Sequence, residues 1–237
     1  IVKEKANDMT FIEALKNGDL EAVRSFPKAD LHNHFVLGGN RKYIYEKYGY
    51  EIKPVANVLS SMSEMEAWNG KYIGRHFNST EGRKRLVEAT FQQAKYDGIS
   101  ILEIGEDVWG LGAFFHNDIG ELIYAFQEAN YRIAPNTSLR LQIGLSRHCP
   151  IEYLQDCLKH FWGHKEFYSI DLYGDELAQP IENFIPIYEK AAENGFFSAY
   201  VSPTDRLFPN ELSVRILPEA EKYLLNGNTL VPEDFGE

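Results

Sequence analysis

Two histidines, His32 and His34, end the stretch "FPKADLHNH" (residues 26–34) with a single residue between them. In a β-strand, the side chains of residues i and i+2 point to the same face of the sheet. Two imidazoles that converge in this way suit one divalent metal ion. The spacing therefore predicts two metal ligands, although an isolated His-x-His pair also fits two strand-end histidines in ordinary hydrogen bonds.

Three further residues are candidates for the same site. His148 ends a predicted strand on the face that carries the histidine pair, and is expected to be a substitute ligand, a substrate contact or a histidine bonded to the backbone. Glu103 and Glu106 surround the end of another strand and offer a carboxylate, with Glu106 expected nearer the active face. The aromatic stretch "WGLGAFFHND" (residues 109–118) is predicted to be a loop that lines an apolar pocket or covers the site. The remaining histidines are expected on the surface or in loops: His76, His116, His160 and His164.

Alternating helices and strands would position these residues. The predicted strands are residues 28–33, 99–105, 138–147, 167–174 and 196–202, and the predicted helices are residues 9–26 (two short helices), 81–98, 118–133, 150–162, 180–195 and 209–225. This alternation predicts an α/β fold of parallel strands joined by right-handed crossovers. A (β/α)8 barrel needs eight strands, whereas a doubly wound sheet needs only five or six, so the periodicity leaves both architectures open.

Four stretches carry a resemblance to a known family. "PKADLHNH" behind a helical lead-in resembles the opening of the adenosine deaminase family, a branch of the metal-dependent amidohydrolases built on a (β/α)8 barrel. "DGISILEIGED" and "SLRLQIGLSRH" are similar to the second and third strands of that family. "SIDLYGDE" (residues 169–176) is similar to its fourth-strand Ile-Asp-Leu-x-Gly-Asp-Glu. The resemblance covers residues 10–195 and implies a TIM-barrel type of fold that is incomplete, with about five recognisable β/α units.

The resemblance also implies roles for particular residues. His32 and His34 would bind one divalent metal ion, and zinc is the expected ion. Gly174 would let the backbone approach a purine ring, Asp175 belongs to the acidic pair that follows it, and His148 would contact the substrate. The implied reaction is hydrolytic deamination of a purine nucleoside or related amine, in which a metal-activated water attacks the ring carbon and ammonia leaves.

Three departures weaken the inference of activity. Phe35 and Val36 stand where the family carries an acid that contacts a sugar hydroxyl, so an unmodified ribose is not expected as part of the substrate. At the end of the fifth strand, Tyr200 and Pro203 stand where the family has a histidine ligand and a glutamate that shuttles protons. Residues 204–237 contain no counterpart of the family's later histidine and aspartate.

Three hypotheses follow from these residues. The first is a deaminase-like metal hydrolase that is incomplete or divergent in its C-terminal half. The second is a catalytically inactive or truncated relative that binds a ligand or partner. The third is a metallo-phosphoesterase of the polymerase-and-histidinol-phosphatase type, whose first strand also reads Asp-x-His-x-His but which needs several later ligands.

The composition limits the partners. A formal net charge of -11 disfavours nucleic acid and anionic membranes, so a small-molecule substrate is expected. No stretch approaches the roughly 20 apolar residues of a membrane span, and no basic and apolar leader precedes the first predicted helix, so a cytoplasmic location is expected. We expect a helical lead-in (residues 1–27), a partial barrel (28–203) and an unassigned C-terminal helical segment (204–237). Because five strands leave open edges, a homo-oligomer or a partner chain is expected to complete the barrel.

Overall fold

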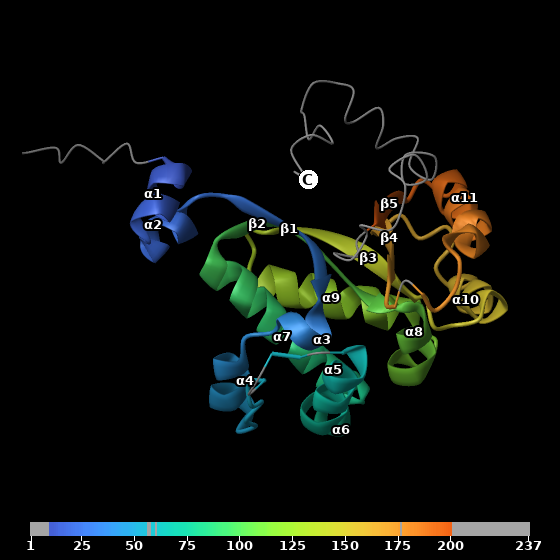
Figure 1. Cartoon of the computed structure of the whole chain (residues 1–237), viewed down its shortest axis with the longest axis horizontal. Coiled ribbons are helices and arrows are strands. Elements are labelled where there is room, and N and C mark those ends of the chain that lie inside the picture. Colours follow the sequence, from blue (N-terminus) through green and yellow to red (C-terminus); the bar gives the residue numbers. More distant parts are fainter. Residues whose placement is uncertain (1–9, 56–57, 60, 176, 201–237) are drawn as a thin grey trace, which may run out of the picture.

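The computed structural model describes residues 10–55, 58–59, 61–175 and 177–200 of the chain (Figure 1). The predicted helix at 209–225 therefore lies outside the described residues, as do Ser202 and Pro203. The proposed division into lead-in, partial barrel and C-terminal segment stays a prediction. Among the described residues, no helix has the length and apolar character that a membrane crossing requires.

Five parallel strands form one sheet in the described part of the chain. They are β1 (Lys28–His34), β2 (Ile99–Asp107), β3 (Ser138–Ser146), β4 (Phe167–Tyr173) and β5 (Phe197–Tyr200). Their order in the sheet is the order of the chain, β1-β2-β3-β4-β5. A doubly wound sheet reverses its strand order at a switch point, whereas a (β/α)8 barrel adds each strand beside the last. The order therefore confirms the barrel type and excludes the doubly wound alternative for these strands.

Helices join successive strands. The main crossover helices are α7 (Thr80–Asp97), α9 (Ile119–Ile133), α10 (Ile151–Leu158) and α11 (Ile185–Glu193), the last preceded by the 3-10 turn η2 (Ile181–Phe184). Local signals explain their limits, because Ser79 and Asp118 accept hydrogen bonds from backbone N–H groups in the first turns of α7 and α9. Gly98 ends α7 in the left-handed conformation that helix C-termini favour.

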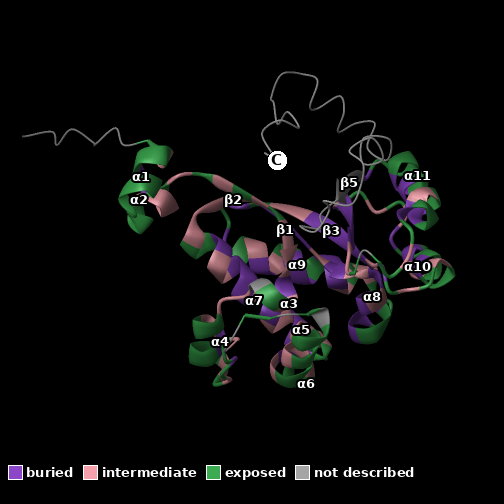
Figure 2. Cartoon of the chain, in the orientation of Figure 1, coloured by how far each residue is buried: buried purple, intermediate pink, exposed green. Residues whose placement is uncertain are grey.

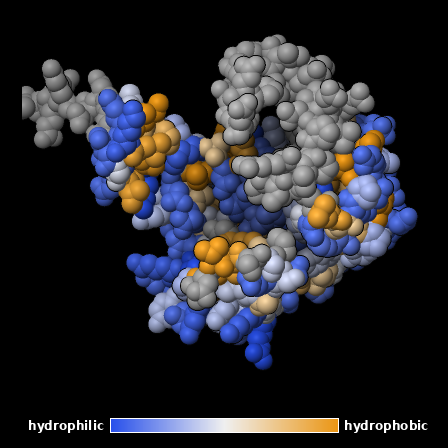
Figure 3. All heavy atoms as spheres, in the orientation of Figure 1, coloured by the Kyte–Doolittle hydropathy of each residue, from blue (hydrophilic) through white to orange (hydrophobic). Residues whose placement is uncertain are grey.

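Shorter helices surround this framework. The lead-in consists of α1 (Phe11–Asn17), which begins with a capping box between Thr10 and Glu13, and α2 (Leu20–Ser25). The segment after β1, which the sequence left unassigned, contains α3 (Phe35–Gly38), α4 (Arg41–Tyr48), α5 (Met62–Asn69), the π-helical turn η1 (Gly70–Gly74) and α6 (Arg75–Phe77). Apolar residues gather on one side of α1 and α2 in the space-filling view (Figure 3).

The aromatic stretch after β2 is not a loop, so that prediction was wrong. It forms α8 (Val108–Phe115), in which Leu111, Phe114 and Phe115 are buried in the core. Burial of the apolar residues of the stretch against neighbouring helices stabilises a helix, despite the low helix propensity of its two glycines, Gly110 and Gly112.

The two faces of the sheet differ in chemistry. Helices α7 and α9 lie against one face of the sheet and carry buried residues, purple in Figure 2 (Figures 1 and 2). The core side chains of β2, β3 and β4 are almost fully buried on this face: Leu102, Ile104, Leu141, Ile143, Leu145, Ile170 and Leu172. The opposite, inner face carries a polar layer, in which Glu103 accepts hydrogen bonds from Arg140 and Ser169, both at 3.1 Å. Alternation along each strand therefore assigns one face to the core and the other to polar chemistry.

Candidate metal centre

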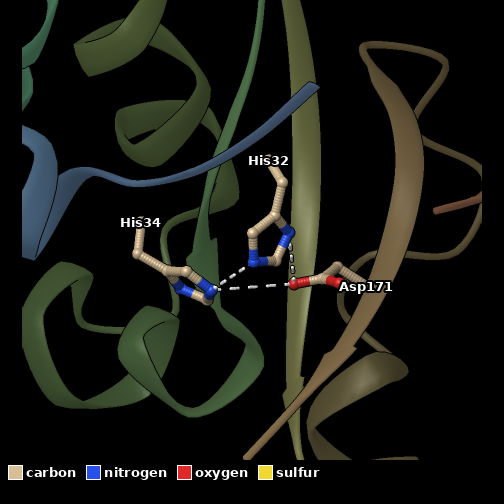
Figure 4. A group of neighbouring side chains, drawn as sticks. All are labelled: His32, His34 and Asp171. Carbon is tan, nitrogen blue, oxygen red and sulfur yellow. Dashed lines mark hydrogen bonds and ion pairs between the residues drawn. The ribbon is translucent and has the colours of Figure 1, made fainter. Parts of the chain in front are cut away.

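The two histidines of β1 meet as their spacing predicted. Their Nε2 atoms lie 3.0 Å apart, and their ring centroids are 4.6 Å apart with the rings nearly perpendicular (Figure 4). They stand at the carboxyl end of the strand, on the inner face of the sheet. Because β-strand geometry alone produces this convergence, the sequence was sufficient to predict it.

Asp171 of β4 completes a group of three. Its Oδ2 lies 3.4 Å from Nδ1 of His32 and 3.9 Å from Nε2 of His34. In sheet order β4 is three strands from β1, which in a flat sheet would separate them by roughly 14 Å at about 4.8 Å a strand. The approach of Asp171 to the histidines therefore requires the sheet to curl as a barrel wall does.

Burial sets the protonation of the two imidazoles. Burial lowers the pKa of His34, and burial together with the nearby His34 lowers the pKa of His32. Both rings therefore stay neutral at neutral pH, which is the form that binds a metal ion.

This group fits a metal ion. Each of the three residues offers one ligand atom, all of these atoms lie within 4.8 Å of one another, and no other such group occurs among the described residues. Nδ1 of His32 is buried and makes no hydrogen bond within that part of the chain. Two imidazoles and one carboxylate are a donor set that catalytic zinc sites use, with the fourth position left to water or substrate.

The three residues implied to contact substrate lie together. Gly174 follows β4 with φ +108°, and a Cβ added there would lie 3.2 Å from Cδ2 of His148. The backbone N–H of Asp175 donates to Nε2 of His148 at 3.3 Å. His148 does not belong to the group of potential ligands, so its role as a substitute ligand is not supported, and its contact with substrate stays a prediction.

The prediction that Glu106 lies nearer the active face was wrong. Its carboxylate is buried on the opposite face of β2, where Oε2 lies 3.6 Å from Nε of Arg83, and burial raises its pKa. The residue on the inner face is Asp107, because side chains alternate along the strand. Glu103 does face inward, but Arg140 and Ser169 occupy its carboxylate.

Asp171 was missed as a candidate ligand, although the motif that contains it was singled out. The available signal was the period of two in "SIDLYG", which places Ser169, Asp171 and Tyr173 on one face. Tyr173, also missed, lies against His34 with ring centroids 4.8 Å apart. Glu176 lies outside the described residues, and Tyr200 is described only as the last residue of β5.

A curled parallel sheet whose strands follow the order of the chain, with two histidines and an aspartate at their carboxyl ends, defines the class of fold, the wall of a (β/α)8 barrel. No protein-family model matches the chain. The chain is 25% identical over 176 residues to a putative adenosine/adenine deaminase of Treponema pallidum, covering 73% of this chain and 57% of that protein. The resemblance to the adenosine deaminase family, N-terminal part only, is therefore confirmed.

Solved structures agree on the fold. Adenine deaminase of Arthrobacter aurescens superposes with a TM-score of 0.58 at 16% identity, covering 79% of this chain and 61% of that one. An amidohydrolase of Burkhoderia ambifaria with bound zinc gives a TM-score of 0.60 at 13% identity, covering 89% and 59%. The chain thus spans about three fifths of each relative, and its fold is the corresponding part of a (β/α)8 barrel.

Proposed function

We propose that this protein is a deaminase-type, metal-dependent hydrolase that releases ammonia from an adenine-like amine. The observation that carries the proposal is the convergence of His32, His34 and Asp171, within 4.8 Å, from strands that are not neighbours in the sheet. Similarity to a putative adenosine/adenine deaminase supports the same reaction class. We propose zinc as the ion, since neutral imidazoles and a carboxylate suit it.

The residues of the site would divide the work. His32, His34 and Asp171 would hold the ion, which when bound lowers the pKa of its water from about 16 towards 7. Gly174, which lacks a Cβ, would let the backbone lie close to a flat ring. The imidazole of His148, whose Nε2 accepts a hydrogen bond from the backbone N–H of Asp175, would lie beside that ring.

The substrate is proposed to be a purine base or a related amine rather than an ordinary ribonucleoside. Phe35, at the position where the family carries a sugar-binding acid, is 2% exposed and packs edge-to-face on Phe126. It therefore presents no acceptor to a sugar hydroxyl. Without that acceptor, a ribose on the substrate would add little to the free energy of binding.

The metallo-phosphoesterase hypothesis gains no support from the site. It requires several ligands beyond the first pair, whereas the described residues contain one candidate group with a single carboxylate. An experiment can separate the hydrolase from an inactive, ligand-binding relative. The inactive relative would bind a ligand without turning it over, whereas the hydrolase would release ammonia.

Metal content tests the proposal directly. We expect about one zinc per chain by elemental mass spectrometry after purification, and loss of most of it in His32→Ala and Asp171→Asn, because an open zinc site has three protein ligands. His160→Ala is the matched control, since that histidine is exposed and lies in the turn that follows α10, outside the group of potential ligands. Absence of stoichiometric metal in the wild type, or full occupancy in His32→Ala, would contradict the proposal.

Ammonia release then tests the reaction. The metal-loaded chain should release ammonia from adenine faster than from adenosine, and Asp171→Asn should abolish this activity. Metal binding with no release from any purine amine would instead favour the ligand-binding relative.

A further inference from the structure

Tyr173 connects the candidate metal centre to a second polar group on the inner face. Its ring packs edge-to-face against His34, with centroids 4.8 Å apart and an interplanar angle of 79°. The two residues end different strands, β4 and β1, which the curl of the sheet brings together. The ring of Tyr173 thus contacts one side of the imidazole that would bind the ion.

Two hydrogen bonds hold the hydroxyl of Tyr173. It donates to the carboxylate of Asp107, the last residue of β2, and accepts from the indole N–H of Trp109, at the start of α8. A tyrosine held at both its ring and its hydroxyl has little freedom to rotate. The ring of Tyr173 is therefore a rigid surface against His34 rather than a mobile one.

The backbone makes room for this contact at Gly144. This residue of β3 is in register with Asp107 on one side and Asp171 on the other. A Cβ at this position would lie 2.6 Å from Oδ1 of Asp107 and 3.4 Å from Cε1 of Tyr173. Any side chain at this position would push the carboxylate away from the tyrosine, so the glycine is part of the same arrangement.

We propose that Tyr173, anchored by Asp107 and Trp109, is a positioning residue that fixes the ring plane of His34 for metal binding. This proposal rests on the metal site proposed above. Tyr173 would not bind the ion or the substrate itself. It would prevent rotation of the imidazole, as groups behind metal ligands commonly do, and thereby raise the affinity and define the geometry of the site.

Zinc affinity and the absorption spectrum of bound Co²⁺ test the proposal without reference to turnover. Removal of such an outer partner typically weakens metal binding about 10- to 100-fold, and we expect Tyr173→Leu to fall in this range. Tyr173→Phe and Asp107→Asn keep the ring but weaken its anchor, and should shift affinity and the visible Co²⁺ bands in the same direction by less. Zinc affinity would be measured by competition with a chromophoric chelator.

Tyr188→Leu is the matched control. Tyr188 is a tyrosine of α11 that is 4% exposed, so its replacement removes a buried ring of the same size outside the site. It should lower thermal stability and leave zinc affinity and the Co²⁺ spectrum unchanged. If Tyr173→Leu behaves like this control, Tyr173 is only a packing residue and the proposal is overturned.

The outcomes separate this proposal from the function on which it rests. A wild-type chain without stoichiometric metal overturns both. A wild-type chain that binds metal, with Tyr173 variants that bind it equally well and with the same spectrum, overturns only the positioning role. If Tyr173→Leu does not fold, Tyr173→Phe and Asp107→Asn decide, because wild-type affinity and spectrum in both would show that the anchor does not matter.

Discussion

Two constraints require a glycine at position 174, the backbone conformation of the turn and the close approach of His148. Its φ of +108° is a conformation that residues with a Cβ rarely adopt, and a Cβ would press on the ring of His148 at 3.2 Å. A glycine at this turn is thus required by the fold of this chain, independently of any ligand.

Replacement of this glycine should destabilise the protein. We expect Gly174→Ala to lower the free energy of unfolding by about 1–3 kcal/mol, because the alanine must occupy a strained backbone conformation. Gly163→Ala is the control, since Gly163 also has a positive φ, +84°, but nothing lies within 4 Å of its added Cβ. Urea denaturation should show a larger loss of unfolding free energy for Gly174→Ala than for Gly163→Ala. In a chain that also carries His148→Ala, the loss caused by Gly174→Ala should be smaller. Equal losses at the two glycines would mean that the His148 contact is unimportant.

At the scale of elements, Glu88 ties three helices together behind the sheet. Its carboxylate on α7 accepts hydrogen bonds from Lys47 and Tyr43 of α4, at 2.6 Å and 3.0 Å, and another from Tyr48. Arg132 of α9 binds its second oxygen. Burial alone would raise the pKa of Glu88, but the hydrogen bonds from α4 outweigh it and hold the pKa at about 2.

This depressed pKa predicts a pH dependence of stability. A carboxyl whose folded pKa lies below its unfolded value stabilises the fold above about pH 4.5, and this stabilisation is lost as the pH falls towards 2. Glu88→Gln should therefore cost about 1–2 kcal/mol at pH 7, after allowance for solvent screening, and flatten the stability curve between pH 5 and 2. Glu81→Gln, at an exposed carboxylate paired only with Arg85, is the control. Parallel curves for wild type and Glu88→Gln would contradict the assignment.

At the scale of the whole molecule, the described sheet has open edges. Strand β1 pairs only with β2 within the described residues, so its other side presents unpaired backbone groups. Leu31 on this strand is 51% exposed, and the lead-in helices that precede it in the chain expose Ile12 and Leu20. An edge with these properties favours pairing with another chain.

Association in solution is therefore expected. Multi-angle light scattering should detect a species larger than the 27.2 kDa monomer, and Leu31→Lys should shift it towards the monomer, because a charge on an edge strand opposes pairing. Val58→Lys is the control, since Val58 is 95% exposed but belongs to the segment between α4 and α5 and not to an edge strand. A wild-type chain that is monomeric at every concentration would disprove this expectation.

The sequence by itself determined the strands, the main crossover helices and half of the site. Caps, glycine stops and alternating apolar residues act over a few residues, so α7, α9 and the strands could be predicted from local physics. The His32–His34 pair followed for the same reason, because two residues along one strand always share a face. The resemblance to the adenosine deaminase family predicted the barrel architecture, which the alternation of strands and helices had left open.

Only the tertiary structure decided which residues of distant strands and helices come into contact. Asp171 reaches the histidines because the sheet curls between β1 and β4, and no local spacing encodes contacts over 137 residues of chain to His34 and 139 to His32. The same holds for Tyr173 against His34 and for Glu88 between its three helices. The direction of Glu106 was misjudged because one residue of register in a strand reverses the face, and only the packing against Arg83 shows which face it takes.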